Sequence, residues 1–167
     1  MQNIKPSSDK KLVIAVIGGS QCTPEISIKA ETVGRELAKR GVVLVCGGLG
    51  GVMEAACRGA AAEQGITVGI LPGTDPDSAN PYVQIRITTG LGEARNVVII
   101  RSAHAVIAID GEYGTLSEIA FALKNGKPVI GLNTWELWRE GEKIDSVLEC
   151  DDAIDAVETA VKMAQYH

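Results

Sequence analysis

Short apolar runs alternate along the chain with segments in which apolar positions recur at helical spacing. Each run is about four to six residues long and rich in Val, Ile, Leu and Ala, which is typical of buried strands. The predicted strands are residues 12–17, 42–46, 66–71, 84–88, 105–109 and 129–132. The predicted helices are residues 23–40, 52–64, 92–103, 115–125 and 151–165. This alternation predicts an α/β fold: a doubly wound, Rossmann-like parallel sheet in three α/β/α layers, forming a single domain.

Turn and cap residues agree with these boundaries. Thr23-Pro24-Glu25 combines an N-cap, a first-turn proline and a first-turn acid, and Gly41 ends the same helix. The loop 72–81 is rich in Pro, Gly, Asp, Ser and Asn and is long enough to cover a site. We expect residues 1–10 to be a flexible tail and residues 11–167 to form the domain. The segment around Trp135 and Trp138 is left unassigned.

Composition narrows the function classes. The net charge of −5 and pI near 5.1 argue against non-specific nucleic-acid binding, which needs a basic face. The four cysteines show no CxxC pair, and the two histidines are too few for a multi-histidine metal site. The polar start lacks a signal peptide, and no apolar run reaches the length of a membrane span. These features predict a cytoplasmic protein with reduced thiols, no metal site and no membrane or nucleic-acid partner.

Glycine clusters follow three of the predicted strands. Because parallel strands end at one edge of a sheet, the clusters should converge on the crevice where such folds bind ligands. A helix that begins at Thr115 directs free backbone N–H groups and a positive dipole end to the same edge, which favours phosphate. The residues predicted to bind the ligand are Gly18, Gly19, Ser20, Gly47, Gly48, Gly50, Gly51, Met53, Gly111, Tyr113, Gly114 and Thr115.

Each motif also has a plainer interpretation. Thr115 and Glu118 have the spacing of a capping box, in which the two side chains satisfy the helix start. Arg95 could be an exposed helix residue, but the apolar residues 97–100 after it favour a buried anionic partner. The cluster 47–51 fits a dinucleotide fingerprint poorly, because Met53 occupies the final small position and no P-loop lysine follows.

Three motifs in this order resemble the LOG-like (Lonely Guy) superfamily: Gly47-Gly48-Leu49-Gly50-Gly51-Val52-Met53, Gly92-Glu93-Ala94-Arg95-Asn96 and Gly111-Glu112-Tyr113-Gly114-Thr115-Leu116-Ser117-Glu118. The superfamily includes proteins once labelled "possible lysine decarboxylase", the molybdenum-cofactor carrier proteins and the Rossmann domain of DprA/Smf. Its enzymes cleave the N-glycosidic bond of AMP or cytokinin nucleotides. By resemblance, Arg95 and Glu118 take the arginine and glutamate positions of that chemistry.

Departures from the enzyme motif leave two functions open. Asp110 and Glu112 replace a proline and a glycine of the enzyme motif, and Asn96 replaces its lysine. The chain looks closer to the cofactor-carrier branch, which implies binding of a nucleotide-like phosphorylated ligand such as molybdenum cofactor. The alternative is a phosphoribohydrolase that releases base and ribose 5-phosphate from AMP-like substrates. Neither needs a resident cofactor, and no lysine has the context of a decarboxylase.

A homodimer is the remaining prediction. The helix predicted at 92–103 carries apolar residues at four successive positions, 97–100, so that little of its surface is polar. The superfamily resemblance also implies a dimer that is formed by helices near this point.

Overall fold

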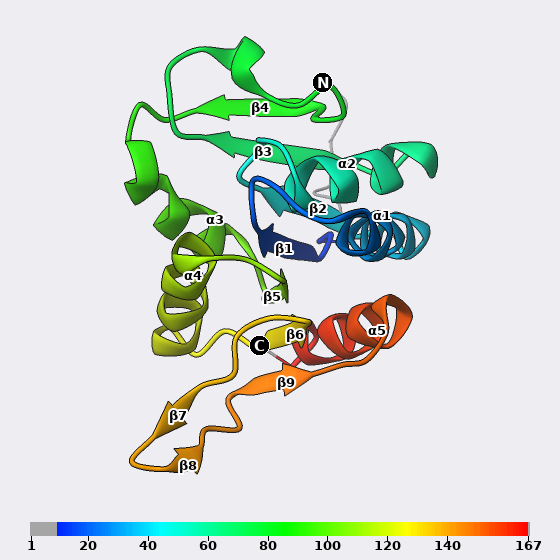
Figure 1. The fold of residues 1–167 in the computed structure, drawn as a ribbon. Helices are drawn as coiled ribbons and strands as arrows, with labels where there is room; N and C mark the ends of the chain where they lie inside the picture. Colours follow the sequence, from blue (N-terminus) through cyan, green and yellow to red (C-terminus); the bar gives the residue numbers. More distant parts are fainter. Residues whose placement is uncertain (1–9, 167) are drawn as a thin grey trace, which may run out of the picture.

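The computed structural model describes residues 10–166, and its centre is a seven-stranded sheet in the order β4-β3-β2-β1-β5-β6-β9 (Figure 1). Every neighbouring pair of strands in this sheet is parallel. The strands are β1 (Val13–Gly18), β2 (Val43–Cys46), β3 (Thr67–Leu71), β4 (Ile85–Thr88), β5 (Ala105–Ile109), β6 (Val129–Leu132) and β9 (Val147–Glu149). The fold predicted from the sequence is confirmed.

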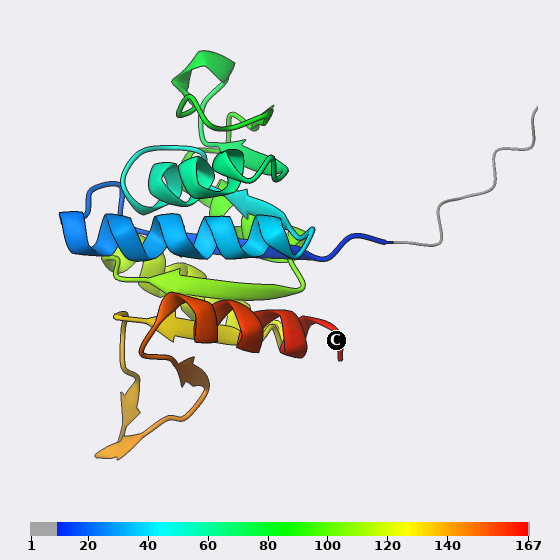
Figure 2. The same ribbon diagram turned by 90° about the vertical axis from the view of Figure 1, so that its right-hand side faces the viewer.

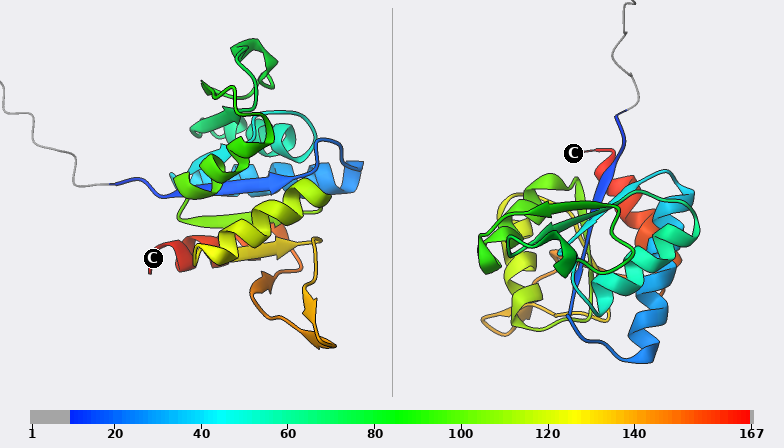
Figure 3. Two further views of the ribbon diagram at one scale, coloured as in Figure 1. Left: turned by 90° about the vertical axis from the view of Figure 1, so that its left-hand side faces the viewer. Right: turned by 90° about the horizontal axis from the view of Figure 1, so that it is seen from above.

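Helices cover both faces of the sheet. One face carries α1 (Pro24–Lys39), α2 (Val52–Ala62) and α5 (Ala153–Ala164), which lie in front of the sheet in Figure 2. The other face carries α3 (Asn96–Ser102) and α4 (Tyr113–Lys124), shown in the left panel of Figure 3. Two short 3₁₀ turns, η1 (Pro76–Ser78) and η2 (Gly92–Arg95), lie in the loops that precede and follow β4.

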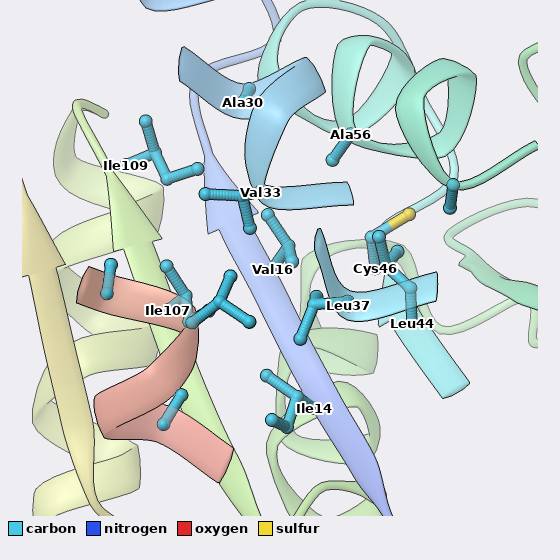
Figure 4. Packing of buried hydrophobic residues seen from close by; sticks show 14 of the residues in the cluster. Ile14, Val16, Ala30, Val33, Leu37, Leu44, Cys46, Ala56, Ile107 and Ile109 are labelled. Carbon is cyan, nitrogen blue, oxygen red and sulfur yellow. The ribbon is translucent and has the colours of Figure 1, made fainter. Parts of the chain in front are cut away.

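Side chains that alternate along the central strand hold the three layers together. Ile14 and Val16 of β1 belong to the cluster under α1, α2 and α5, where Val33 and Leu37 of α1 pack on them (Figure 4). Ala15 and Ile17 of the same strand belong to the cluster under α3 and α4. Because successive strand residues face opposite sides, one buried apolar strand supplies both cores.

The order of the strands places a switch point at the centre of the sheet. From β1 the chain builds outward through β2 and β3 to β4, and it then returns to place β5 on the other side of β1. In such sheets the connections after the two central strands diverge, which opens a crevice beyond their carboxyl ends. Residues after β1 and β5 are therefore expected to line any ligand site.

Two helix predictions need correction. The predicted helix 92–103 is divided into the η2 turn and the shorter α3, whose Ile99 and Ile100 are fully buried under the sheet. The helix predicted to begin at Thr115 begins two residues earlier, with Glu112 as an extended N-cap that makes no side-chain cap bond. Thr115 lies buried in the first turn, so the capping-box interpretation of Thr115 and Glu118 is wrong.

The C-terminal third contains elements that the sequence pattern did not predict. The hairpin of β7 (Trp138–Arg139) and β8 (Glu142–Lys143) projects from the body of the molecule (Figure 1). β9 then adds the outermost parallel strand beside β6. Of the predicted tail, residues 1–9 lie outside the described residues. Within residues 10–166, no helix has the length and apolar character needed to cross a membrane.

Candidate functional site

A cavity of about 540 Å³ lies at the switch point, beyond the carboxyl ends of β1, β2 and β5. This volume is in the range of pockets that enclose a small molecule. Its lining residues come from segments that are far apart in the sequence. They are Val16, Ile17, Gly18, Gly19, Ser20, Gln21, Gly47, Leu49, Met53, Pro72, Glu93, Arg95, Asn96, Glu112, Gly114, Thr115 and Glu118.

The structure brings most of the predicted site residues to this cavity. Both candidate catalytic residues line it, together with Gly18, Gly19, Ser20, Gly47, Met53, Gly114 and Thr115. The predicted residues that do not line it are Gly48, Gly50, Gly51, Gly111 and Tyr113. Tyr113 is 80% exposed, and its ring pairs instead with Trp135 at a centroid distance of 5.8 Å.

Arg95 lies at the buried base of the cavity. It is only 8% exposed, and its guanidinium packs against Gly47, where an added Cβ would lie 2.7 Å from Nη2. A side chain at position 47 would therefore displace the guanidinium. Nη1 donates a hydrogen bond to Oδ1 of Asn96, whereas the buried Nε has no acceptor among the described residues. The Arg95 side chain keeps 10% of its surface exposed and lines the cavity, so this cation can attract an anionic ligand there.

Glu118 faces Arg95 from the second turn of α4. Its Oε1 lies 4.0 Å from Nη1 of Arg95, which is the limit of an ion pair rather than a hydrogen bond. Burial raises the pKa of the Glu118 carboxyl from 4.5 to about 7, although the positive charge of Arg95 acts in the opposite direction. Burial also lowers the pKa of Arg95. Glu118 can therefore exchange a proton near neutral pH, as a general acid or base must.

The N-terminus of α4 forms another wall of the cavity. Gly114 and Thr115 line the cavity within the first turn of this helix, which has 12 residues. The first N–H groups of a helix have no partner inside the helix, and the helix dipole adds positive potential there. This combination is a common site for a phosphate group.

The first two glycine loops support each other beside this wall. The N–H of Val52, the first residue of α2, donates to the carbonyl of Gly19 at 3.0 Å. Gly19 in turn lines the cavity, so the loop after β2 fixes the position of the loop after β1. The two loops therefore form one connected wall.

Carboxylates make the cavity less cationic than an ordinary phosphate pocket. Glu93 and Glu112 also line it, and both residues are exposed. Arg95 is the one cationic side chain among the lining residues. Within the described part of the chain, no cluster of His, Cys, Asp or Glu could hold a metal ion.

Several lining residues were missed by motif reasoning. Gln21, Leu49 and Pro72 carry no chemical signature of their own. Asn96 was noticed only as a departure from the enzyme motif, yet it accepts a hydrogen bond from Arg95. The loop 72–81 was expected to be able to cover a site, but Pro72 is its sole residue that lines the cavity.

Cys46 and Cys57 are core thiols. Their sulfur atoms lie 3.5 Å apart behind the loop 47–51, and both residues are fully buried. The hydrogen bond that they share lowers the pKa of Cys46 and raises the pKa of Cys57.

The switch-point cavity, the glycine loops and the buried pair of Arg95 and Glu118 define a Rossmann-like domain of the LOG-like superfamily. More narrowly, the chain belongs to the SLOG cluster4 family, which it matches over residues 11–162. The resemblance first noticed in the three motifs is thereby confirmed.

Similar proteins agree with this assignment. An uncharacterized protein of Archaeoglobus fulgidus is 49% identical over 123 residues, which are 74% of this chain and 81% of that protein. The molybdenum cofactor binding protein of Rippkaea orientalis has a similar structure, with a TM-score of 0.83 and 36% identity over 93% of this chain and 99% of that chain.

Two further structures extend the comparison. The molybdenum cofactor carrier protein of Chlamydomonas reinhardtii has a TM-score of 0.80 and 32% identity, over 94% of this chain and 100% of that chain. DNA processing protein A of Helicobacter pylori has a TM-score of 0.66 and 24% identity, over 90% of this chain and 80% of that chain. The latter likeness is one of fold alone.

Proposed function

We propose that this chain binds a nucleotide or a nucleotide-like phosphorylated ligand, such as molybdenum cofactor, in the switch-point cavity. The observation that carries the proposal is the convergence on one cavity of the α4 N-terminus and the cationic side chain of Arg95. The names of the similar Rippkaea orientalis and Chlamydomonas reinhardtii proteins support molybdenum cofactor as the cargo.

Two parts of the cavity would bind different parts of the ligand. Backbone N–H groups at Gly114 and Thr115 would hold the phosphate, with the Thr115 hydroxyl beside them. The wall formed by Gly18–Ser20 and the loop 47–51 would enclose the rest of the molecule. Arg95, the one cationic side chain among the lining residues, would attract the negative charge of the ligand.

A thermal-shift series tests this binding function. AMP, GMP, ribose 5-phosphate and molybdopterin are each added at millimolar concentration, with inorganic phosphate as the comparison. We expect at least one of the organic phosphates to raise the melting temperature by more than inorganic phosphate does, because a ligand that binds only the folded state stabilises it. If none of them stabilises the protein, the proposal is wrong.

The second candidate function is hydrolysis of the N-glycosidic bond of AMP-like substrates. It is favoured by one observation, a carboxyl at the cavity base whose pKa of about 7 suits proton transfer at neutral pH. Cleavage builds positive charge on the ribose, and an ionised Glu118 would stabilise that charge and orient the attacking water. Water adds to the ribose and its proton leaves with the base, giving free base and ribose 5-phosphate.

We also propose that the chain forms a homodimer through the region around α3. Three large apolar residues shortly before α3 in the chain are exposed, namely Ile85 and Ile87 of the edge strand β4 and Leu91 of the following loop. Ile99 and Ile100 are buried and cannot take part. The dimer surface would therefore consist of the three exposed residues and the half-buried Val97 and Val98. The cytoplasmic location predicted from the sequence stays a prediction.

A further inference from the structure

One buried polar residue outside the cavity, Asn80, is hydrogen-bonded to the glycine-rich loop 47–51. Asn80 lies in the loop between β3 and β4 and is only 6% exposed. Its Nδ2 donates hydrogen bonds to the carbonyls of Gly48 at 3.3 Å and Leu49 at 2.9 Å. Its backbone N–H donates to the same Gly48 carbonyl at 2.8 Å.

The remaining polar atom of the Asn80 side chain keeps the amide in this orientation. Oδ1 accepts a hydrogen bond from the N–H of Tyr82 at 3.1 Å. With the oxygen engaged there, the amide NH₂ group must point toward the loop 47–51. The side chain is therefore fully bonded, and it connects two loops that are about thirty residues apart in the sequence.

The loop that Asn80 holds forms part of the cavity wall. Gly47 and Leu49 line the cavity, and Gly47 is the surface on which the Arg95 guanidinium packs. The loop also leads into Val52, whose N–H holds the carbonyl of Gly19 in the neighbouring wall. Asn80 itself does not line the cavity. Any effect of Asn80 on the loop after β1 or on Arg95 is therefore transmitted through the loop 47–51.

We propose that Asn80 is a positioning residue for the ligand site, which fixes the conformation of the loop 47–51 from behind and thereby the placement of Arg95. This inference rests on the proposed binding function for its effect on affinity, but its effect on the loop can be measured without any ligand. Gly48 has a positive φ of 75°, which is one of several conformations open to a glycine, so the backbone preference of this residue does not by itself fix the loop.

Three variants separate positioning from general stability. Asn80→Ala removes all side-chain bonds. Asn80→Asp keeps the shape and the bond from Tyr82, but an ionised carboxylate cannot donate to the two carbonyls. Thr67→Val is the matched control, because Thr67 is fully buried and its hydroxyl bonds Tyr82 and Gln84 in the same segment without contacting the loop 47–51.

The first measurement is amide hydrogen exchange of the peptide that spans residues 47–51, in the protein without ligand. We expect exchange there to be about fivefold or more faster in both Asn80 variants and unchanged in Thr67→Val, although all three lower the melting temperature. Unchanged exchange in both Asn80 variants would overturn the proposal.

The second measurement is the affinity for AMP by calorimetry. We expect binding to be about tenfold weaker in both Asn80 variants, because two loop-holding hydrogen bonds are lost, and to be retained in Thr67→Val. Equal weakening in all three variants would mean that Asn80 acts only through stability, which contradicts the proposal. If the wild type does not bind AMP, binding of this nucleotide is refuted, and the exchange measurement alone decides the role of Asn80.

Discussion

The Nη1 atom of Arg95 lies 4.0 Å from the Oε1 atom of Glu118, and the two side chains are only 10% and 8% exposed. This distance is too long for the close, bidentate geometry that makes a buried ion pair stable. Glu118 has a raised pKa and Arg95 an unpaired Nε, so both groups bear a cost of burial that the pair does not offset. Such an arrangement is more typical of a ligand-binding or catalytic site than of an ion pair that stabilises the fold.

The Glu118→Gln variant separates the two candidate functions. If the chain is a hydrolase, this change should lower the rate of adenine release from AMP on the order of a hundredfold or more, because the catalytic carboxylate is lost. Binding of AMP should be largely retained, since glutamine keeps the shape of the side chain. Adenine is measured by chromatography, and binding by calorimetry on the same preparations.

The carrier function predicts a different pattern in the same assay. The wild type should then release no adenine at all, and Glu118→Gln should remain folded. Glu25→Gln is a suitable control, because Glu25 lies in the first turn of α1 and outside the cavity. Adenine release that survives in Glu118→Gln would exclude Glu118 as the catalytic residue.

The central strands were predictable because they are buried on both faces. Residues 105–109 are fully buried, so the whole strand reads as one apolar run with a glycine turn after it. Parallel pairing then places the strand ends at one edge, which is why Gly18, Gly47 and Gly114 could be assigned to a common site. These predictions depend on local pattern and on one rule of sheet topology.

What could not be predicted depends on contacts between distant segments. Val147–Glu149 is a three-residue edge strand with one buried residue, so its sequence lacks an apolar run, and only pairing with β6 defines it. The role of Asn80 depends on bonds to carbonyls about thirty residues earlier, and no spacing rule connects them. The start of α4 was misplaced because Thr115 matched a cap motif, whereas its buried side chain packs against Gly111.

The proposed dimer predicts a change of mass when one exposed isoleucine becomes charged. Ile87→Lys should convert the dimer to a monomer, because a lysine at the centre of an apolar interface would be buried without a partner. Ile28→Lys is the matched control, since Ile28 is 67% exposed on α1, on the opposite face of the sheet. Light scattering at micromolar concentration gives the masses. A wild-type monomer would refute the dimer.

Burial of Glu118 predicts a specific dependence of stability on pH. Its pKa is raised from 4.5 to about 7 in the folded state, so between these values the folded chain binds more protons than the unfolded chain. The free energy of unfolding therefore falls as the pH rises through this window, and the loss is complete above about pH 7. Glu118→Gln removes this titration.

Denaturant unfolding at about pH 5 and about pH 8 measures the effect. We expect the stability of Glu118→Gln relative to wild type to increase between these pH values by an amount on the order of 3 kcal/mol. Comparing the difference between the two proteins cancels the other titrating groups that they share. A constant difference across the window would show that Glu118 is not buried as a titrating acid.

The phosphate assignment predicts that one substitution stabilises the fold and weakens binding. Gly114 lies in the first turn of α4 at the cavity, and an added Cβ there would meet no other atom within 4 Å. Gly114→Ala should therefore stabilise the helix by about 0.5–1 kcal/mol, because alanine loses less backbone entropy. The same methyl group would occupy the space that the phosphate needs beside the backbone N–H groups, so affinity for AMP should fall.

Gly73→Ala is the control, because Gly73 is exposed, lies outside the cavity and has room for a Cβ. A Gly114→Ala protein that melts higher yet binds AMP like the wild type would place the phosphate elsewhere in the cavity.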